Sequence, residues 1–325
     1  MPRRKTPIAL APLILCLSLP ARADDLRLSQ PIDCTLGETC HIQHYVDRDP
    51  TTAIRDYRCG ALSYDGHNGT DFALPTLADM RRGVDVLAAA PGVVRGLRDE
   101  MEDREYTDAD RLGITGRECG NGVVLRHEGG YETQYCHLKS GSVRVQQGDR
   151  VDRGAVLGQV GLSGLTQFPH VHLSVRRDGK TVDPSAPDAH AACGADGPDL
   201  WQTTPDYRPG GLLQTGFTDR VPDYAAIRDG TAAQTAIPAD ASALVLFGFA
   251  FGGRKGDVMH FEIDGPGGEL LDQELELDKD QARFFRAAGK RLRAATWPPG
   301  PYTGRVTLRR DGAVLSSSAI TMVIE

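Results

Sequence analysis

The sequence of residues 119–138 is CGNGVVLRHEGGYETQYCHL. Two short runs within it, Gly122–Arg126 and Thr133–Leu138, lie on either side of a glycine pair. Runs of about four to eight residues bounded by glycine are typical of β-strands rather than helices. Gly129 and Gly130 tolerate the positive φ angles of a two-residue hairpin turn. The stretch therefore predicts an antiparallel β-hairpin.

Similar short runs flank this hairpin on both sides. They are Val84–Ala88, Val93–Leu97, Ala155–Val160 and His170–Val175. Asp178 and Gly179 form a second two-residue turn signal after the last of these runs. Together they predict an all-β region with one long insertion, residues 98–118. That insertion is rich in Asp and Glu but lacks the spacing of a known calcium loop, so we expect a solvated loop.

The chain beyond this region carries a second set of strand patterns. Residues 185–209 are rich in Pro, Gly, Ala and Asp, which indicates a linker. After it come an apolar run at Ala243–Phe251, an alternating run at Asp257–Ile263 and another run at Arg305–Arg310. Several short strands within roughly 115 residues predict an immunoglobulin-like β-sandwich over residues 210–325.

Composition and the N-terminus restrict the class of protein. The chain has 325 residues and a net charge of −7, which suits about two domains and gives no electrostatic support for binding nucleic acid. No apolar run approaches the ~20 residues of a membrane span. Basic residues at 3–5, an apolar stretch at Ile8–Leu19 and the Ala-Arg-Ala of residues 21–23 predict a signal peptide over residues 1–23. We therefore expect a secreted protein, most favourably a periplasmic one.

Cysteine usage agrees with export. Six cysteines follow the predicted signal: Cys34, Cys40, Cys59, Cys119, Cys136 and Cys193. An even number in an exported protein indicates disulfides, and we favour a bond between Cys34 and Cys40 while leaving the others open. A two-residue turn would place Cys136 opposite Val123, roughly 13 Å from Cys119 at ~3.3 Å per residue. Without a bulge, that register argues against a Cys119–Cys136 bond.

Three histidine-containing patterns occur in the all-β region. His67 and Asp71 share one face of an extended chain, because side chains alternate with a period of two. His170 and His172 share a face for the same reason, and His137 follows the hairpin's second run. Two imidazoles and one carboxylate around a zinc ion leave a fourth position for water, as a catalytic site requires. The patterns therefore predict a catalytic metal site.

These patterns belong to a longer series of motifs that occur in order. The series is His67-x-Gly69-x-Asp71, Ala88–Val94, Gly120–Val123, Tyr135–Leu138, Gly148–Val151 with Gly154, Gly161–Gly164 and His170–His172. It resembles the lysostaphin-like (LytM-type) zinc metalloendopeptidases, which cut peptides of bacterial peptidoglycan. The resemblance spans about residues 60–184 and implies a lysostaphin-type antiparallel β-sheet peptidase domain over residues 59–184. Cys136, where a small residue is usual, and the acidic insertion depart from the family pattern and concern substrate access.

The resemblance also implies the roles of the site residues. His67, Asp71 and His172 correspond to the ligands of a Zn²⁺ ion. His137 and His170 correspond to the histidines that bind or deprotonate the water and stabilise the tetrahedral intermediate. The implied activity is hydrolysis of peptide bonds in peptidoglycan cross-links or stem peptides.

Other histidines and a basic cluster receive simpler interpretations. No acidic residue is spaced to help His41 and His44 form a metal site, so both are expected to be structural or exposed. In the two-residue register His127 faces away from His137 and is also expected to be structural. A basic cluster in the C-terminal region is expected to be a solvated face, with binding of an anionic envelope partner as the alternative. Its members are Arg283, Arg286, Lys290, Arg291 and Arg293.

Two other functions stay open on sequence alone. A member of this family without catalysis would act as an adaptor that regulates another cell-wall hydrolase, although such members typically lose zinc ligands and this chain keeps all three. A secreted protease acting on proteins is the second alternative. Separately, residues 24–58 are expected to be restrained by their cysteines. This segment would make the enzyme latent if it covered the substrate groove.

Overall fold

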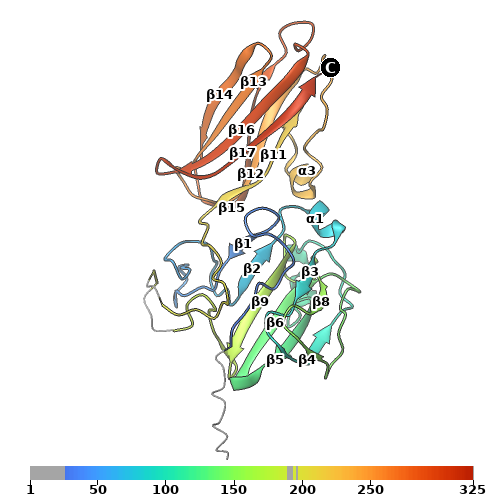
Figure 1. The fold of residues 1–325 in the computed structure, drawn as a ribbon, viewed down its shortest axis with the longest axis vertical. Helices are drawn as coiled ribbons and strands as arrows, with labels where there is room; N and C mark the ends of the chain where they lie inside the picture. The colour runs from blue at the N-terminus through green and yellow to red at the C-terminus, as the bar shows by residue number, and fades with distance from the viewer. Residues whose placement is uncertain (1–25, 189–192, 195–196, 325) are drawn as a thin grey trace, which may run out of the picture.

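An antiparallel sheet of eight strands carries most of the predicted all-β region (Figure 1). The computed structural model describes residues 26–188, 193–194 and 197–324, so the predicted signal peptide lies outside the described residues. The sheet has the order β1-β2-β9-β6-β5-β4-β7, and β10 pairs with β9. Its strands are β1 (His41–His44), β2 (Thr70–Ala73), β4 (Gly92–Arg98), β5 (Asn121–Arg126), β6 (Tyr131–Leu138), β7 (Arg150–Val151), β9 (His170–Arg177) and β10 (Lys180–Thr181).

All six predicted strands in this region are present. The two outside the large sheet, β3 (Asp85–Leu87) and β8 (Val156–Gln159), pair with each other in a separate ribbon. On β9, Val171, Leu173 and Val175 are completely buried in the core, which leaves His170 and His172 on the opposite face of the strand. The alternation in the sequence thus fixes which face of the sheet carries the histidines.

Helices are few and short. They are α1 (Leu77–Arg82), η1 (Asp108–Asp110), α2 (Arg111–Ile114), η2 (Glu128–Gly130) and α3 (Tyr224–Asp229). Within the described part of the chain, no helix combines the length and the apolarity needed to cross a membrane. The acidic insertion contains η1 and α2 and is anchored to the sheet region, because the Asp103 carboxylate accepts hydrogen bonds from the backbone N–H groups of Ser140 (2.9 Å) and Leu162 (2.7 Å).

Segments on both sides of the sheet region are tied to it. The expected Cys34–Cys40 disulfide is present, and a second disulfide joins Cys59 to Cys193. Trp201, within residues 185–209, is 1% exposed and belongs to the core of the first sheet. The segment that the sequence indicates as a linker is therefore packed against the sheet over part of its length.

The C-terminal strands form the predicted β-sandwich. One sheet has the order β11-β12-β15 and the other β14-β13-β16-β17, with every pairing antiparallel. The strands are β11 (Gly211–Thr218), β12 (Ala243–Gly253), β13 (Val258–Gly265), β14 (Gly268–Glu276), β15 (Gln281–Arg291), β16 (Gly300–Arg310) and β17 (Ala313–Ile324). The Tyr302 hydroxyl donates a hydrogen bond to the Pro298 carbonyl (2.9 Å), the corner contact found in immunoglobulin-like folds. The all-β prediction is confirmed for both parts of the chain.

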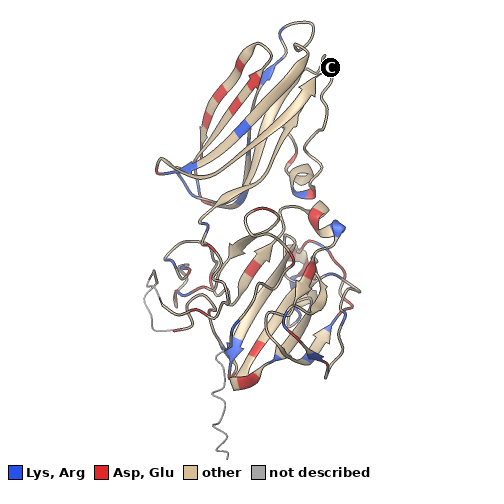
Figure 2. Cartoon of the chain, viewed as in Figure 1, with Lys and Arg blue, Asp and Glu red and all other residues tan. Residues whose placement is uncertain are grey.

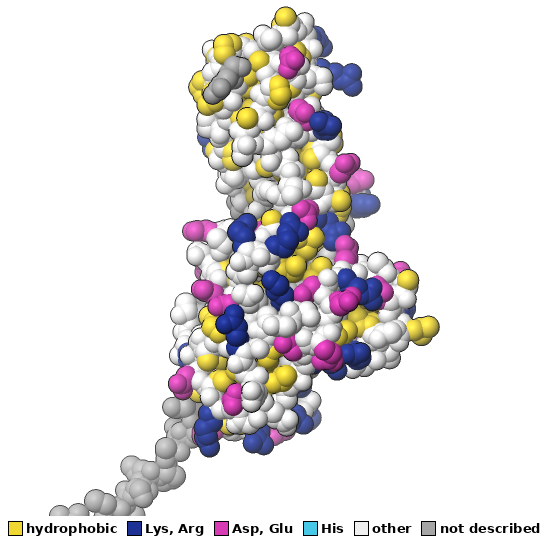
Figure 3. All heavy atoms as spheres, turned by 90° about the vertical axis from the view of Figure 1, so that its right-hand side faces the viewer, with side chains coloured by type: hydrophobic (Ala, Val, Ile, Leu, Met, Phe, Trp, Pro, Cys, Tyr) yellow, Lys and Arg dark blue, Asp and Glu magenta, His cyan; other side chains and the backbone are white. Residues whose placement is uncertain are grey.

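The charged residues of the sandwich lie mainly in the sheet β14-β13-β16-β17, and its acidic residues follow β13 and β14 (Figure 2). On the side where α1 meets α3, charged groups of both signs intermingle (Figure 3). There Arg81 of α1 pairs with Asp229 of α3 (2.8 Å), and Arg228 of α3 pairs with Glu105 of the insertion (2.7 Å). The sandwich therefore contacts the first sheet region through ion pairs.

Arg283 on β15 makes a further contact between the two parts. Its guanidinium donates to the Pro75 and Leu74 carbonyls and lies over the rings of Phe168 (5.3 Å) and Phe249 (4.9 Å). The prediction that the whole basic cluster is solvated is wrong for this residue. A long side chain that buries its stem while donating to carbonyls packs favourably at such a junction.

Replacing Arg283 is expected to destabilise the protein. Arg283→Met keeps the length of the side chain but leaves two carbonyls without their donor, which costs roughly 1–3 kcal/mol. Urea unfolding followed by tryptophan fluorescence reports on both parts, since Trp201 lies in the first core and Trp297 in the sandwich core. Arg293→Met, at an exposed position of the same cluster, is the control and should leave the midpoint unchanged. Equal midpoints for the two variants would show that the Arg283 contacts do not stabilise the junction.

Candidate active site

Strand pairing brings the predicted metal-binding residues together. Asp71 on β2 lies directly opposite His172 on β9 in the antiparallel ladder, and directly opposed side chains are close neighbours. His67 precedes β2 and reaches the same position from the preceding turn. Gly69 leaves the space that the His172 ring occupies, because a Cβ atom at this position would lie 2.5 Å from His172 Nε2. The glycine between His67 and Asp71 is therefore required by close packing.

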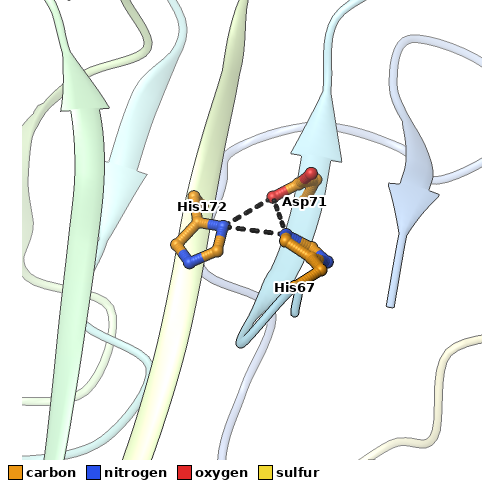
Figure 4. A group of neighbouring side chains, drawn as sticks. All are labelled: His67, Asp71 and His172. Atoms are coloured by element: carbon orange, nitrogen blue, oxygen red, sulfur yellow. Dashed lines mark hydrogen bonds and ion pairs between the residues drawn. The ribbon is translucent and has the colours of Figure 1, made fainter. Parts of the chain in front are cut away.

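Three donor atoms form a small triangle (Figure 4). Asp71 Oδ1 lies 3.1 Å from His67 Nε2 and 2.8 Å from His172 Nδ1, and the two nitrogens are 3.1 Å apart. Among the described residues these three side chains form the group able to hold a metal ion. Ligands ~2.0–2.1 Å from a tetrahedral ion are ~3.3 Å from one another. The observed separations come close to that value, so the donor set fits such an ion.

The second nitrogen of each histidine in the triangle is occupied elsewhere. His67 Nδ1 donates to the Tyr45 carbonyl (2.7 Å). His172 Nε2 lies 2.9 Å from Ser174 Oγ and 3.2 Å from Asn68 Oδ1. A histidine that uses one nitrogen for such an outer contact presents the other nitrogen, with its lone pair, to a metal. Both rings are thus oriented for ligation.

Burial and mutual charge set the protonation of the triangle. Burial lowers the pKa of His172, which keeps this ring neutral and able to ligate. Although burial opposes ionisation of Asp71, the neighbouring histidines, His67 foremost, hold its pKa well below the usual range. Burial also opposes charge on His67, but Asp71 and the Tyr45 carbonyl raise its pKa overall. Asp71 is therefore an anion that attracts positive charge.

His137 and His170 lie beside the triangle. Their ring centroids are 4.6 Å apart, and His170 Nε2 is 3.5 Å from Asp71 Oδ1. His137 Nδ1 donates to the Ser163 carbonyl (2.8 Å), and His170 Nδ1 donates to the Phe168 carbonyl (3.0 Å). Burial, followed by repulsion from the neighbouring histidines, holds the pKa of His137 well below its usual range. Neutral His137 therefore carries its proton on Nδ1 and has a free lone pair on Nε2.

The hairpin differs from the predicted register by one residue. Its loop contains three residues, Glu128–Gly130, so Cys136 lies opposite Gly122 and not Val123. A bulge follows at His137, which has a φ of +63°, and its N–H donates to the Cys119 carbonyl (2.8 Å). In this register the Cα atoms of Cys119 and Cys136 lie 4.8 Å apart, and the two residues form the disulfide that the two-residue register argued against. The prediction failed because a bulge inserts a residue that periodicity cannot reveal.

Sequence reasoning also missed residues around the triangle. His44, expected to be structural or exposed, places Nδ1 3.0 Å from Asp71 Oδ2. The half-exposed Tyr64 has its ring 4.4 Å from the His67 ring. No fixed spacing links these residues to Asp71, so only the folded chain brings them together. His127 is structural as expected, with its nitrogens bonded to the Pro91 carbonyl and Thr133 Oγ1.

Residues 65–184 match the sequence profile of the family described as Peptidase family M23. This part of the chain is therefore similar to M23 peptidases. Over 118 residues it is 35% identical to the DD-carboxypeptidase/endopeptidase Mpg of Neisseria meningitidis serogroup B, covering 36% of this chain and 22% of that protein. It is 32% identical over 117 residues to the peptidoglycan DD-endopeptidase ShyA of Vibrio cholerae, again covering 36% and 22%.

Solved M23 structures also resemble the chain. The catalytic domain of the prophage-encoded M23 protein EnpA from Enterococcus faecalis aligns with 47% of this chain and 94% of its own, at 23% identity and a TM-score of 0.31. The match to Mpg and ShyA covers only about a fifth of either protein's length. The family match itself concerns residues 65–184, which include His67, Asp71, His137, His170 and His172.

Enlarging Gly69 is expected to disrupt the triangle, because an added Cβ atom would lie 2.5 Å from His172 Nε2 and 2.8 Å from the Leu173 carbonyl oxygen. In Gly69→Ala the added methyl group displaces the His172 ring, so Co²⁺ titration followed by visible absorption should show binding about 10–100-fold weaker. Gly96→Ala is the matched control, because its Cβ would meet no atom within 4 Å. Co²⁺ binding by Gly69→Ala as tight as that of the control would contradict the packing account.

Proposed function

We propose that this protein is a zinc-dependent endopeptidase that hydrolyses peptide bonds in peptidoglycan cross-links or stem peptides outside the cytoplasm. The observation that carries the proposal is the convergence of three donor atoms beside two further histidines, His137 and His170, whose Nδ1 atoms are committed to backbone carbonyls. The similarity to the peptidoglycan DD-endopeptidase ShyA supports peptidoglycan as the substrate. Three disulfides and the predicted signal peptide support an extracytoplasmic location.

We assign His67, Asp71 and His172 as the residues that hold the Zn²⁺ ion. Two imidazoles and one carboxylate are a donor set typical of catalytic zinc, and they leave one position open. When bound, zinc polarises a carbonyl group and lowers the pKa of a coordinated water toward 7. The outer contacts of His67 and His172 keep the two rings in the tautomers that this role needs.

His137 and His170 are proposed to bind the attacking water, transfer its proton and stabilise the negative charge that develops on the intermediate. Neutral His137 accepts a proton at Nε2, because Nδ1 is committed to the Ser163 carbonyl. The resulting imidazolium can donate the same proton to the leaving amine, as general acid–base catalysis requires. His170, held by the Phe168 carbonyl, lies close enough to Asp71 to bind the water beside His137.

Removing His137 should separate catalysis from metal binding. His137→Ala is expected to lower kcat about 10²–10⁴-fold while the zinc content stays at the wild-type level. His172→Ala should lose both zinc and activity. Zinc content by plasma mass spectrometry and turnover of a purified cross-linked muropeptide measure the two effects. Loss of zinc from His137→Ala would contradict its assignment as a non-ligand.

The substrate is tested with purified sacculi. Protein lacking residues 1–23 should release muropeptides whose masses correspond to addition of one water at a peptide bond. The products should disappear with a chelator and return with Zn²⁺. His260→Ala, which removes a histidine bonded to Asp272 in the sandwich, is the matched control and should remain active. Zinc-loaded protein that cleaves casein but not sacculi would favour a protein substrate, and the absence of both zinc and products would favour an adaptor.

A further inference from the structure

Strand β1 and Tyr45, which follows it, lie outside the M23 match yet contact two of the three proposed zinc ligands. His44 Nδ1 lies 3.0 Å from Asp71 Oδ2, and the Tyr45 carbonyl accepts a 2.7 Å hydrogen bond from His67 Nδ1. Asp71 Oδ1 is the oxygen within the donor triangle, so His44 holds the oxygen outside it. Since an ionised carboxylate only accepts hydrogen bonds, His44 Nδ1 must be the donor in this contact.

A β-bulge turns the His44 side chain toward the Asp71 carboxylate. In the pairing of β1 with β2, Ile42 lies opposite Phe72, but His44 lies opposite Asp71, so Gln43 is the extra residue. Gln43 is completely buried, and its Nε2 donates to the Ala282 carbonyl of the sandwich (3.1 Å). Bulges near active sites commonly redirect a side chain in this way. The sandwich contact thus secures the bulge that places His44.

Aromatic rings confine His44 in this orientation. Its ring centroid lies 5.3 Å from Tyr64, 5.7 Å from His67 and 6.0 Å from Phe168. The His44 side chain is 12% exposed and that of Asp71 is 2% exposed. Water therefore has little access to replace the hydrogen bond if His44 is removed. The second oxygen of Asp71 would then lose its fixed partner.

We infer that His44 is a positioning residue that fixes the Asp71 carboxylate for zinc binding, so that the site extends beyond the M23 domain to β1. This inference rests on the proposed zinc site. The terminal torsion of an aspartate is soft, and a hydrogen bond to one oxygen sets the direction of the other. Outer partners of this kind commonly change metal affinity about 10–100-fold when removed.

The inference assigns a function to part of residues 24–58. If this segment were a removable cover, trimming it would open the groove and raise turnover. Because His44 of β1 and the adjacent Tyr45 supply the outer partners of Asp71 and His67, loss of the segment should instead weaken zinc binding. An account of the site that begins at residue 65 would omit both contacts.

Two substitutions at His44 separate the hydrogen bond from packing. His44→Leu fills the space without a donor, whereas the side-chain amide of His44→Asn can donate from nearly the same place as Nδ1. Competition with a fluorescent zinc chelator should show affinity about 10–100-fold weaker for His44→Leu and within about threefold of wild type for His44→Asn. Ile42→Val, at a buried position of the same strand whose side chain belongs to the core, is the control for altered packing of β1.

Several results would overturn the inference. Equal zinc affinity for His44→Leu and wild type would show that His44 does not position Asp71. Equal losses of zinc affinity for His44→Leu and Ile42→Val would indicate a general effect of β1 packing. A Co²⁺ spectrum that changes to a different coordination number in His44→Asn would make His44 a direct ligand. Failure of the wild-type protein to bind zinc would instead refute the proposed function, so the two failures are distinguishable.

Discussion

A single buried carboxylate, that of Asp71, determines the arrangement around it. It is 2% exposed, and four histidines approach its two oxygens: His44, His67, His170 and His172. A buried anion without compensation is costly, and hydrogen bonds with positive charge reduce that cost. The buried negative charge that attracts these imidazoles also favours binding of a divalent cation. In this account the metal-binding tendency of the site follows from burying one acid among bases.

The sheet explains how the bases reach this acid. Pairing of β2 with β9 sets His172 opposite Asp71, and Gly69 provides space for the imidazole. A bulge in β1 turns His44 inward, and another in β6 places His137 at a positive φ beside the Cys119–Cys136 disulfide. Both irregularities lie at strand positions next to the site, where local strain is commonly maintained by the surrounding structure.

Much of this architecture was predictable from the sequence, for physical reasons. Short runs bounded by turn-forming residues located the six strands, and alternation with a period of two placed His170 and His172 on one face, opposite Val171. Close spacing and a glycine identified the Cys34–Cys40 bond. The family motifs selected His67, Asp71 and His172, which the folded chain brings together, although their assignment as ligands stays a prediction. The domain boundaries and the roles of His137 and His170 also stay predictions.

The features that the sequence did not reveal depend on register and long-range packing. A three-residue loop in place of a two-residue turn shifts the pairing of Cys136, and the bulge at Gln43 gives His44 its place. Arg283 is far from the site in sequence, but its guanidinium lies over Phe168, whose ring stacks on His170 at 4.5 Å. Such contacts arise only when distant segments meet, so periodicity and spacing do not predict them.

The most direct test of the central claim is an anomalous difference map, collected at the zinc absorption edge, from crystals of the zinc-loaded protein. The account predicts one strong peak about 2.0–2.2 Å from His67 Nε2, Asp71 Oδ1 and His172 Nδ1. Asp71 Oδ2 should remain on His44, and neither His137 nor His170 should coordinate the ion. A peak elsewhere, or no peak at these three atoms in zinc-loaded protein, would contradict it.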